Sequence, residues 1–544
     1  MGKVLKVTLL SINAKYVHSS LAVWYLAAAA EKYSAVKHDV NVVESTINQN
    51  IDDIIKRTVA GTPDIIGISV YIWNVKLLPE LLAGIRRQLS NVTIILGGPE
   101  VTHNAKYWLK NDADYVIQGE GERSFPALLD ELSGYKTENK ITACDEYVNP
   151  FSDEYFANLG GRIAYIETSR GCPFDCAYCL SGSSGVQFFL IDAVKEQIRK
   201  LAESGTRTVK FVDRTFNCNS KRAYEILNFI MQLDTDCCFH FEIAADLLTE
   251  EILTLLKSVP AGRIQFEIGI QSFHQQTLDA VSRKTDLIKA EGNIRKLLAI
   301  GNIHIHVDLI AGLPYESLGI FANSFNRAYF LGAHMLQLGF LKMLHGSKLR
   351  EQAENWGIVY NGEPPYQIIS NPWLSTEDLN ILETAEDALQ HTYNKGRFLS
   401  VLRYVLNVSG LSPFEFFRGL GEYVFSHAMP LKEYAEKIYH YCSGLPNVDT
   451  YKLRDCMVCD LLGMVKGKNM PQILRTRGEK RWQAVNYASK KLRRAVDYDE
   501  AEVLTTGEFV YVDGSVRDSI TRLYEVKCGK QTRLICLDVW KGWE

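Results

Sequence analysis

Residues 1 to 135 alternate short apolar runs with amphipathic stretches. The apolar runs predict strands at Val4–Leu10, Asp39–Val43, Ile65–Val70, Thr93–Leu96 and Tyr115–Gln118. Between them apolar positions recur at helical spacing, as in Leu77–Gln88 and Ser124–Glu131. Strand–helix alternation of this kind predicts an α/β domain with a doubly wound, Rossmann-like parallel sheet. Its ligand site is expected beyond the carboxyl ends of the strands.

A second alternating series follows a polar stretch. Its predicted strands are Ile163–Thr168, Thr208–Val212, Phe239–Ile243, Arg263–Ile268, Ile303–Ile310 and Met335–Leu341. Helical patterns such as Ile191–Glu203 and Ala223–Gln232 lie between them. Six βα units in this length suit a partial (βα)6 TIM-type barrel better than a full barrel of typically about 250 residues.

The alternation ends near Leu344, and the remaining chain is mostly helical in pattern, as in Glu377–Thr392 and Glu415–Ser426. Three apolar runs near the end predict a small β element: Glu508–Val512, Arg522–Val526 and Thr532–Val539. We therefore expect a Rossmann-like domain at 1–140, a linker at 141–160, a partial barrel at 161–345 and a mainly helical domain at 346–544.

Composition narrows the functional classes. A net charge of −4 over 544 residues gives no nucleic-acid footprint. No apolar run approaches the roughly 18 residues of a membrane-spanning helix, and no export signal is visible, which predicts a cytoplasmic protein. In a reducing compartment the twelve cysteines favour metal or redox chemistry over disulfides.

Three of these cysteines form a C-x3-C-x2-C motif. Cys172, Cys176 and Cys179 follow the first strand of the predicted barrel, at its carboxyl face. Three thiolates can ligate three irons of a [4Fe–4S] cluster and leave the fourth iron open. The alternatives are a zinc site or a chance spacing. A structural zinc needs a fourth ligand, usually from a second C-x2-C pair, and none lies nearby.

This spacing, on a barrel of this pattern, resembles the radical S-adenosylmethionine (SAM) superfamily. The resemblance implies that the amino and carboxylate groups of SAM bind the open iron, and that one electron from the cluster cleaves SAM to a 5′-deoxyadenosyl radical. It also implies that SAM contacts lie at Tyr178, Asp213, Phe216, Asn217, Glu242, Glu267, Gln271, Ser272, Asp308, Gly312 and Pro314. The alternative is that some of these polar residues cap helices, since Asn217 or Asn219 suits an N-cap.

A doubly wound domain before a radical barrel resembles the cobalamin-binding class of that superfamily. The strand-end residues that carry this resemblance are Asn13, Tyr16, Ser69, Tyr71, Trp73, Asn74, Gly97, Gly98, Pro99, Glu100, Gly119, Glu120 and Gly121. Glycines let the backbone approach a large ligand, and a helix starting after Gly121 could hold an anion. The alternative is a domain that keeps the fold without the ligand.

The chain lacks the D-x-H-x-x-G motif that supplies an axial histidine in many cobalamin proteins. His18 lies in the corresponding loop with the wrong spacing, and we expect it to be a partly exposed histidine of the first turn. His103 is interpreted in the same way. The resemblance then implies cobalamin without a histidine ligand, its lower face open or shielded by Tyr16, Tyr71 or Trp73.

A second cysteine pair, Cys456-Met-Val-Cys459, lies in the carboxyl-terminal part. With Cys442 it could hold another cluster. The spacing also places both thiols near one helical face, and we expect buried helix cysteines.

The resemblance implies a cobalamin-dependent radical SAM methyltransferase acting on an unactivated carbon of a small, natural-product-like molecule. Cyclisation, ring contraction or rearrangement without methyl transfer is the alternative, and a non-catalytic cobalamin sensor is a third. An electron donor such as flavodoxin or ferredoxin is implied, with no nucleic-acid partner. Fold and cofactors do not identify the substrate.

Overall fold

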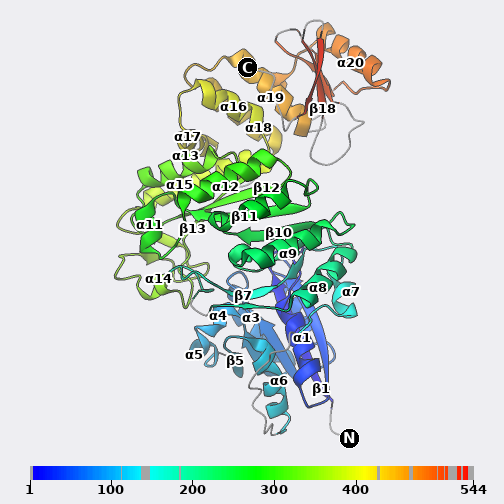
Figure 1. Cartoon of the computed structure of the whole chain (residues 1–544), viewed down its shortest axis with the longest axis vertical. Helices are drawn as coiled ribbons and strands as arrows, with labels where there is room; N and C mark the ends of the chain where they lie inside the picture. Colours follow the sequence, from blue (N-terminus) through cyan, green and yellow to red (C-terminus); the bar gives the residue numbers. More distant parts are fainter. Residues whose placement is uncertain are drawn as a thin grey trace. The chain divides into compact units, whose positions relative to one another are not determined.

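The computed structural model describes residues 4–111, 113–135, 148–182, 185–424, 429–464, 470–498, 500–505, 507, 509–512, 523–528 and 531–536. The chain forms two compact units (Figure 1). The first comprises Met1–Glu316 and Gly339–Trp373, and the second comprises Ser317–Leu338 and Leu374–Glu544. Residues 141–147 of the predicted linker lie outside the described residues.

The first unit begins with a five-stranded parallel sheet of order β2-β1-β3-β4-β5. Its strands are β1 (Leu5–Asn13), β2 (His38–Thr46), β3 (Ile65–Ser69), β4 (Thr93–Gly97) and β5 (Tyr115–Ile117). The strand order reverses between β1 and β3, as in a doubly wound fold. The predicted Rossmann-like domain is thus confirmed, with strand ends shifted by a few residues.

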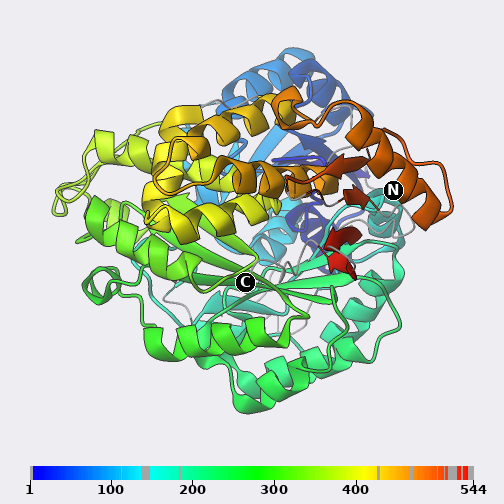
Figure 2. The ribbon, with the colours of Figure 1, turned by 90° about the horizontal axis from the view of Figure 1, so that it is seen from above.

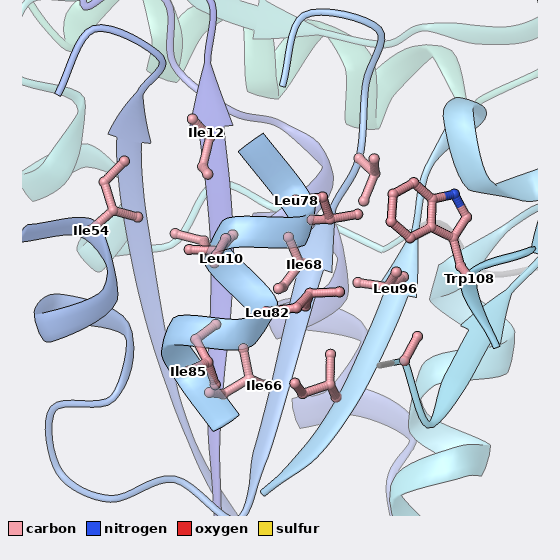
Figure 3. Packing of buried hydrophobic residues seen from close by; sticks show 14 of the residues in the cluster. Leu10, Ile12, Ile54, Ile66, Ile68, Leu78, Leu82, Ile85, Leu96 and Trp108 are labelled. Carbon is pink, nitrogen blue, oxygen red and sulfur yellow. The ribbon is translucent and has the colours of Figure 1, made fainter. Parts of the chain in front are cut away.

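Both faces of this sheet are covered by helices. Leu10 and Ile68 pack against Leu82 in helix α3 (Leu78–Gln88), and helix α2 (Ile51–Thr58) lies on the same face (Figure 3). Short helices α4 (Pro99–Thr102) and α5 (Ala105–Trp108) follow β4. Gly67, the neighbour of Ile68 on β3, lies on the opposite face of the sheet, toward α6 (Gly121–Leu132). Helix α1 (Ala22–Tyr33) packs beside α6 on that face. Strand alternation thus sends apolar side chains to both faces.

The barrel sheet runs in the order β13-β12-β11-β10-β9-β6. These strands are β6 (Ala164–Ile166), β9 (Thr208–Phe211), β10 (Cys238–Ile243), β11 (Ile264–Gln271), β12 (His304–Ala311) and β13 (Met335–Phe340). In Figure 2 helices coloured teal to green run along the outside of the green strands. Those helices include α8 (Ile191–Glu203), α9 (Ser220–Met231), α10 (Glu250–Leu256), α11 (Gln275–Ala280) and α12 (Leu287–Ile300). The predicted partial (βα)6 barrel is confirmed.

Two features of this unit differ from the prediction. Residues 153–159 of the expected linker form helix α7 (Asp153–Leu159), because Ser152 accepts a hydrogen bond from Tyr155 N and the left-handed Gly160 ends the helix. Tyr155 is buried there. An antiparallel hairpin, β7 (Ser169–Cys172) with β8 (Gly185–Phe188), also follows β6. The first cysteine of the motif therefore lies on a strand.

Later segments complete the first unit with α14 (Lys348–Glu351) and the hairpin β14 (Val359–Tyr360) with β15 (Ile368–Ser370). The second unit is mainly helical, as predicted, and ends in an antiparallel sheet of order β16-β17-β18-β19. Its helices are α13 (Leu318–Tyr329), α15 (Thr376–His391), α16 (Leu399–Val408), α17 (Pro413–Val424), α18 (Leu431–Ser443), α19 (Thr450–Met464) and α20 (Glu479–Leu492). Its strands are β16 (Ala501–Val503), β17 (Phe509–Val512), β18 (Leu523–Cys528) and β19 (Gln531–Cys536). No helix in the described part is long and apolar enough to cross a membrane.

Candidate active site

A cavity of about 1020 Å³ lies where the Rossmann-like domain meets the barrel. That volume is at the upper end of small-molecule sites, which suits a large cofactor. The predicted residues that line this cavity are Ser69, Tyr71, Trp73, Gly97, Gly98, Pro99, Glu100, Gly119, Glu120, Gly121, Tyr178 and Cys179. They come from the ends of β3, β4 and β5 and from the cysteine loop, so the sheet presents its carboxyl edge to the cavity.

The loop after β3 presents an aromatic pair. The rings of Tyr71 and Trp73 stack with centroids 4.4 Å apart and planes 5° from parallel. Trp73 Nε1 donates to Ile12 O at 3.0 Å. Asn74 shapes this loop from behind, because its amide accepts from Tyr71 N at 2.9 Å and donates to Ser69 O at 3.1 Å. Asn74 is thus a buried residue that stabilises this loop through hydrogen bonds, whereas the sequence predicts that it contacts the cofactor.

The loop after β4 brings the backbone close to the cavity. Gly98 has φ +112, and a Cβ there would lie 2.5 Å from Val70 O. Glycine alone fits such a position. Glu100 is 6% exposed and accepts a hydrogen bond from the hydroxyl of Tyr366. Burial raises the pKa of Glu100, although that hydrogen bond and Arg350 oppose the shift.

A charged network borders the cavity after β5. Arg170, two residues before Cys172, donates to Glu122 at 2.8 Å and to Glu167 at 2.6 Å, and lies 3.4 Å from Glu120. Burial raises the pKa of Glu167, and Arg170 opposes that shift. The network joins the β5 loop to the hairpin that carries the first cysteine.

The loop after β1 faces the barrel instead of the cavity. Asn13 Nδ2 donates to Glu44 at 3.0 Å, and Glu44 forms a 2.9 Å ion pair with Arg162. His18 Nδ1 lies 2.7 Å from the hydroxyl of Tyr165 and pairs in a parallel bridge with Ile163. Asn13 and Tyr16, which the sequence predicts as cofactor contacts, do not line this cavity. Asn13 is bonded at the domain junction, and Tyr16 is 73% exposed and does not line the cavity.

A smaller cavity of about 170 Å³ lies over the cysteine loop. The predicted residues that line it are Cys172, Cys176, Cys179, Tyr178, Glu242, Glu267, Gln271 and Asp308. The loop is anchored through Ala177, whose N–H donates to Val281 O at 2.9 Å and whose carbonyl accepts from Leu349 N at 2.8 Å. The three thiols thus face one cavity from a fixed loop.

Carboxylates from neighbouring barrel strands form the opposite wall. Glu267 accepts from Lys210 at 3.1 Å and lies 2.9 Å from His240 Nε2. The His240 hydrogen bond and the Lys210 charge lower the pKa of Glu267 to about 2, against burial. Burial raises the pKa of Glu242 and raises that of Asp308 well above its usual value. The pKa values of neighbouring carboxyl groups are therefore shifted in opposite directions.

Two further residues shape this cavity. Gln271 adopts φ +70 at an irregularity in the β11 register, and a Cβ on Gly269 would meet its side chain. Backbone in this region is strained for a non-glycine residue, as is common at functional sites. The half-buried Arg283 donates to Gly269 O at 2.6 Å and approaches Cys176 Sγ at 3.9 Å.

Several predicted SAM contacts line neither cavity. Asp213, 1% exposed, accepts from Thr168 N, Thr168 Oγ1 and Ser169 Oγ at 3.0, 2.7 and 2.5 Å. Asn217 exchanges two hydrogen bonds with the backbone of Ala244, and Asn219 caps α9 (Ser220–Met231). The polar atoms of Asp213, Asn217 and Asn219 are therefore already hydrogen-bonded within the protein. This geometry favours a role in holding the surrounding loops in place over direct contact with a cofactor.

The remaining predicted contacts are also packed inside the fold. Phe216 packs on Phe241, and Ser272 donates to Glu316 at 2.5 Å. Gly312 lies against Ile368, and Pro314 is buried. These residues follow barrel strands and line neither cavity.

The two cavities share three residues: Tyr178, Cys179 and Arg214. Sequence reasoning missed Arg214, and it missed Glu167, Arg170, Arg283 and His345 as cavity residues. His345 follows the sixth barrel strand, where a search of strand ends would have found it. Burial, together with Arg350 and His103, lowers the pKa of His345 to about 4.

The residues present fit the implied cofactors. Cys172, Cys176 and Cys179 are free thiols. No three His, Cys, Asp or Glu side chains among the described residues form a site for a single ion. Cluster ligands bind separate irons, so they need not converge on one point. The larger cavity offers close backbone at Gly98 and polar groups for a ligand rich in amides.

Cys442, Cys456 and Cys459 are buried in helices α18 and α19 of the second unit. Burial raises the pKa of all three thiols. Neutral buried thiols favour the interpretation of Cys456 and Cys459 as helix-packing residues.

Protein-family comparisons match three successive segments. Residues 7–129 match the B12 binding domain, residues 166–328 match the radical SAM superfamily, and residues 354–518 match a protein of unknown function, DUF4080. The first two matches cover all the residues that line the two cavities except Leu344 and His345. They agree with the predicted cobalamin, SAM and [4Fe–4S] cofactors.

Curated relatives include an uncharacterized methyltransferase of Pyrococcus horikoshii, 26% identical over 55% of this chain and 70% of that protein. The cobalamin-dependent radical SAM methyltransferase TokK of Streptomyces tokunonensis is 22% identical over 54% of this chain. The match spans half (50%) of TokK.

Solved structures share the fold. The cobalamin-dependent SAM radical enzyme OxsB, with aqua-cobalamin and SAM bound, aligns with TM-score 0.58 and 16% identity, covering 84% of this chain and 78% of OxsB. The radical SAM methyltransferase TsrM from Kitasatospora setae aligns with TM-score 0.53 and 17% identity, covering 66% and 78%. The chain thus carries a B12-binding domain, a radical SAM domain and a DUF4080 segment in succession, and its relatives include cobalamin-dependent radical SAM methyltransferases.

Proposed function

We propose that this enzyme is a cobalamin-dependent radical SAM methyltransferase that adds a methyl group to an unactivated carbon of a small molecule. One observation carries the proposal: Tyr178, Cys179 and Arg214 line both the larger cavity and the cysteine cavity. A substrate at this junction would be in reach of two cofactors. The names of the methyltransferase relatives support the same reaction class.

In this proposal Cys172, Cys176 and Cys179 hold the [4Fe–4S] cluster, and SAM lies beside Glu242, Gln271 and Asp308. When bound, the cluster and SAM supply an organic radical, and cobalamin supplies a carrier for a methyl group.

The chain's own residues orient these groups. Glu120, Glu122 and Glu167 are held by Arg170 and can accept hydrogen bonds from the amide side chains of the corrin. The stacked rings of Tyr71 and Trp73 offer an aromatic wall that carries no histidine nitrogen for cobalt. We expect this wall to shield the lower face of the cofactor and to exclude water.

Anaerobic reconstitution tests the proposal. The enzyme is loaded with cluster and cobalamin, given a reductant, SAM and a small-molecule extract, and its nucleoside products are measured by mass spectrometry. S-adenosylhomocysteine together with 5′-deoxyadenosine supports methyl transfer. 5′-Deoxyadenosine alone contradicts it and favours cyclisation, ring contraction or rearrangement.

Two variants control this measurement. Cys176→Ala removes a cluster ligand and should abolish 5′-deoxyadenosine. Cys238→Ala removes a half-buried thiol outside both cavities and should leave the products unchanged. We expect the electron to come from a donor such as flavodoxin or ferredoxin in a reducing cytoplasm.

A further inference from the structure

Arg214 occupies a fixed position on the wall that the two cavities share. It lies between two anchored neighbours. Asp213 is bonded to Thr168 and Ser169, and Thr215 Oγ1 lies 3.5 Å from Cys172 Sγ. The backbone at Arg214 is therefore tied to the same segment that carries the first cysteine, while its own side chain is exposed.

The three arginines that line these cavities differ in their partners. Arg170 is paired with Glu122 and Glu167, and Arg283 donates to Gly269 O. The guanidinium of Arg214 has no hydrogen bond or ion pair with any residue in the described part of the chain. A permanent charge with five donors thus faces the junction of the cavities without a hydrogen-bonded partner, although it lies close enough to Glu242 to lower the pKa of that carboxyl group.

A guanidinium fork matches the two oxygens of a carboxylate or phosphate. Nearby carboxylates already have cations: Arg170 holds Glu167, and Lys210 lies 3.8 Å from Glu242. We propose that the molecule methylated by this enzyme carries a carboxylate or phosphate group, which Arg214 binds between the two cofactors. This inference rests on the proposed function, because it places the substrate at the junction.

Two other anions would be present in the loaded enzyme, and each would have a better-placed partner. The carboxylate of SAM would bind at the cluster, where the half-buried Arg283 lies 3.9 Å from Cys176 Sγ. The phosphodiester of cobalamin has the amino-terminal end of α6, since Gly121 lines the larger cavity. Arg214 therefore remains for a third molecule.

Inorganic phosphate serves as the probe in holoenzyme that carries the oxidised cluster and cob(II)alamin. The unpaired electron of cob(II)alamin should speed 31P relaxation of phosphate bound nearby, relative to the diamagnetic cob(III) form. We expect this enhancement in the wild type, a loss of at least tenfold in Arg214→Gln and partial retention in Arg214→Lys. Arg418→Gln, an exposed arginine in the second unit, should match the wild type.

Two further measurements identify which molecule supplies the anionic group that Arg214 binds. Saturating SAM should leave the enhancement intact, and Arg214→Gln should bind cobalamin as tightly as the wild type in an absorbance titration. Loss of the enhancement with SAM would assign Arg214 to SAM, and a tenfold weaker cobalamin affinity would assign it to the nucleotide tail. Either result overturns the inference, as does an enhancement that is absent or unchanged in Arg214→Gln.

None of these readouts requires turnover. A failed phosphate experiment leaves methyl transfer standing, whereas missing S-adenosylhomocysteine overturns methyl transfer and leaves the anion site standing.

Discussion

Replacing Asp213 by alanine separates a structural role from the cofactor contact that the sequence suggested. The substitution leaves three buried donors without their acceptor: Thr168 N–H, Thr168 O–H and Ser169 O–H. An unsatisfied buried donor costs about 1–3 kcal/mol, and hydroxyls can partly reorient, so we expect a loss of about 4 kcal/mol. For a barrel of this size that corresponds to a lower Tm by roughly 8–16 °C.

The assay is thermal unfolding of the cofactor-free protein, followed by circular dichroism, together with iron content after reconstitution. Asp213→Ala should also retain less iron, because Ser169 begins the strand that ends at Cys172. Asp236→Ala, in an exposed loop, should shift Tm by no more than a surface change does, about 0.5 kcal/mol. If Asp213→Ala left Tm unchanged but weakened SAM binding, the structural role would be refuted. Asp213 would then be a direct contact of SAM, as the sequence predicts.

Three further outcomes are expected. Cys176→Ala should lose the iron and the visible absorption of the cluster while cobalamin titration is unchanged; a wild-type iron content would contradict the ligand assignment. Gly98→Ala should weaken cobalamin binding at least tenfold, because backbone strain of about 1–3 kcal/mol is added at the cavity. Gly292→Ala, where a Cβ meets open space, is its control, and equal affinities would count against close backbone approach. The His240 bond lowers the pKa of Glu267 from 4.5 to about 2, so this carboxylate stabilises the fold above pH 4.5 and loses that contribution, at most about 3 kcal/mol, as the pH falls toward 2. Glu267→Gln should flatten the acid unfolding of the cofactor-free protein in that window, and an unchanged acid transition would speak against the pKa shift.

Much of the architecture was predictable from the sequence because both sheets are parallel and buried. Their strands are apolar runs with regular spacing, and the carboxyl edge of such sheets holds the site. Tyr71, Gly98 and Glu120, from the loops after β3, β4 and β5, accordingly line the larger cavity. The C-x3-C-x2-C motif was equally direct, because three thiols within eight residues have few structural uses.

Other parts of the site depend on partners far away in the sequence. Asp213 and Asn217 stand at a strand end like true cavity residues, but their acceptors and donors belong to segments 27 to 45 residues distant. No local sequence pattern reveals that these side chains are hydrogen-bonded to distant segments. Arg214 was missed for the same reason: only the structure shows which arginines already have partners.

Helix α7 was hidden by composition. Its polar residues read as a linker, and its one buried ring, Tyr155, packs on Trp24 from the first domain with centroids 5.7 Å apart. A seven-residue helix also offers too little periodicity to detect.

The bonded loop after β1 limits how this protein can be recombined. Arg162 of the barrel holds Glu44, and Ile163 bridges to His18, so the B12-binding domain is joined to its barrel through side chains and backbone together. Exchanging that domain for one that carries an axial histidine in this loop would remove Glu44 from Arg162 and His18 from Tyr165, and both half-buried side chains would lose those partners. A functional chimera would therefore have to exchange Arg162, Ile163 and Tyr165 together with the domain.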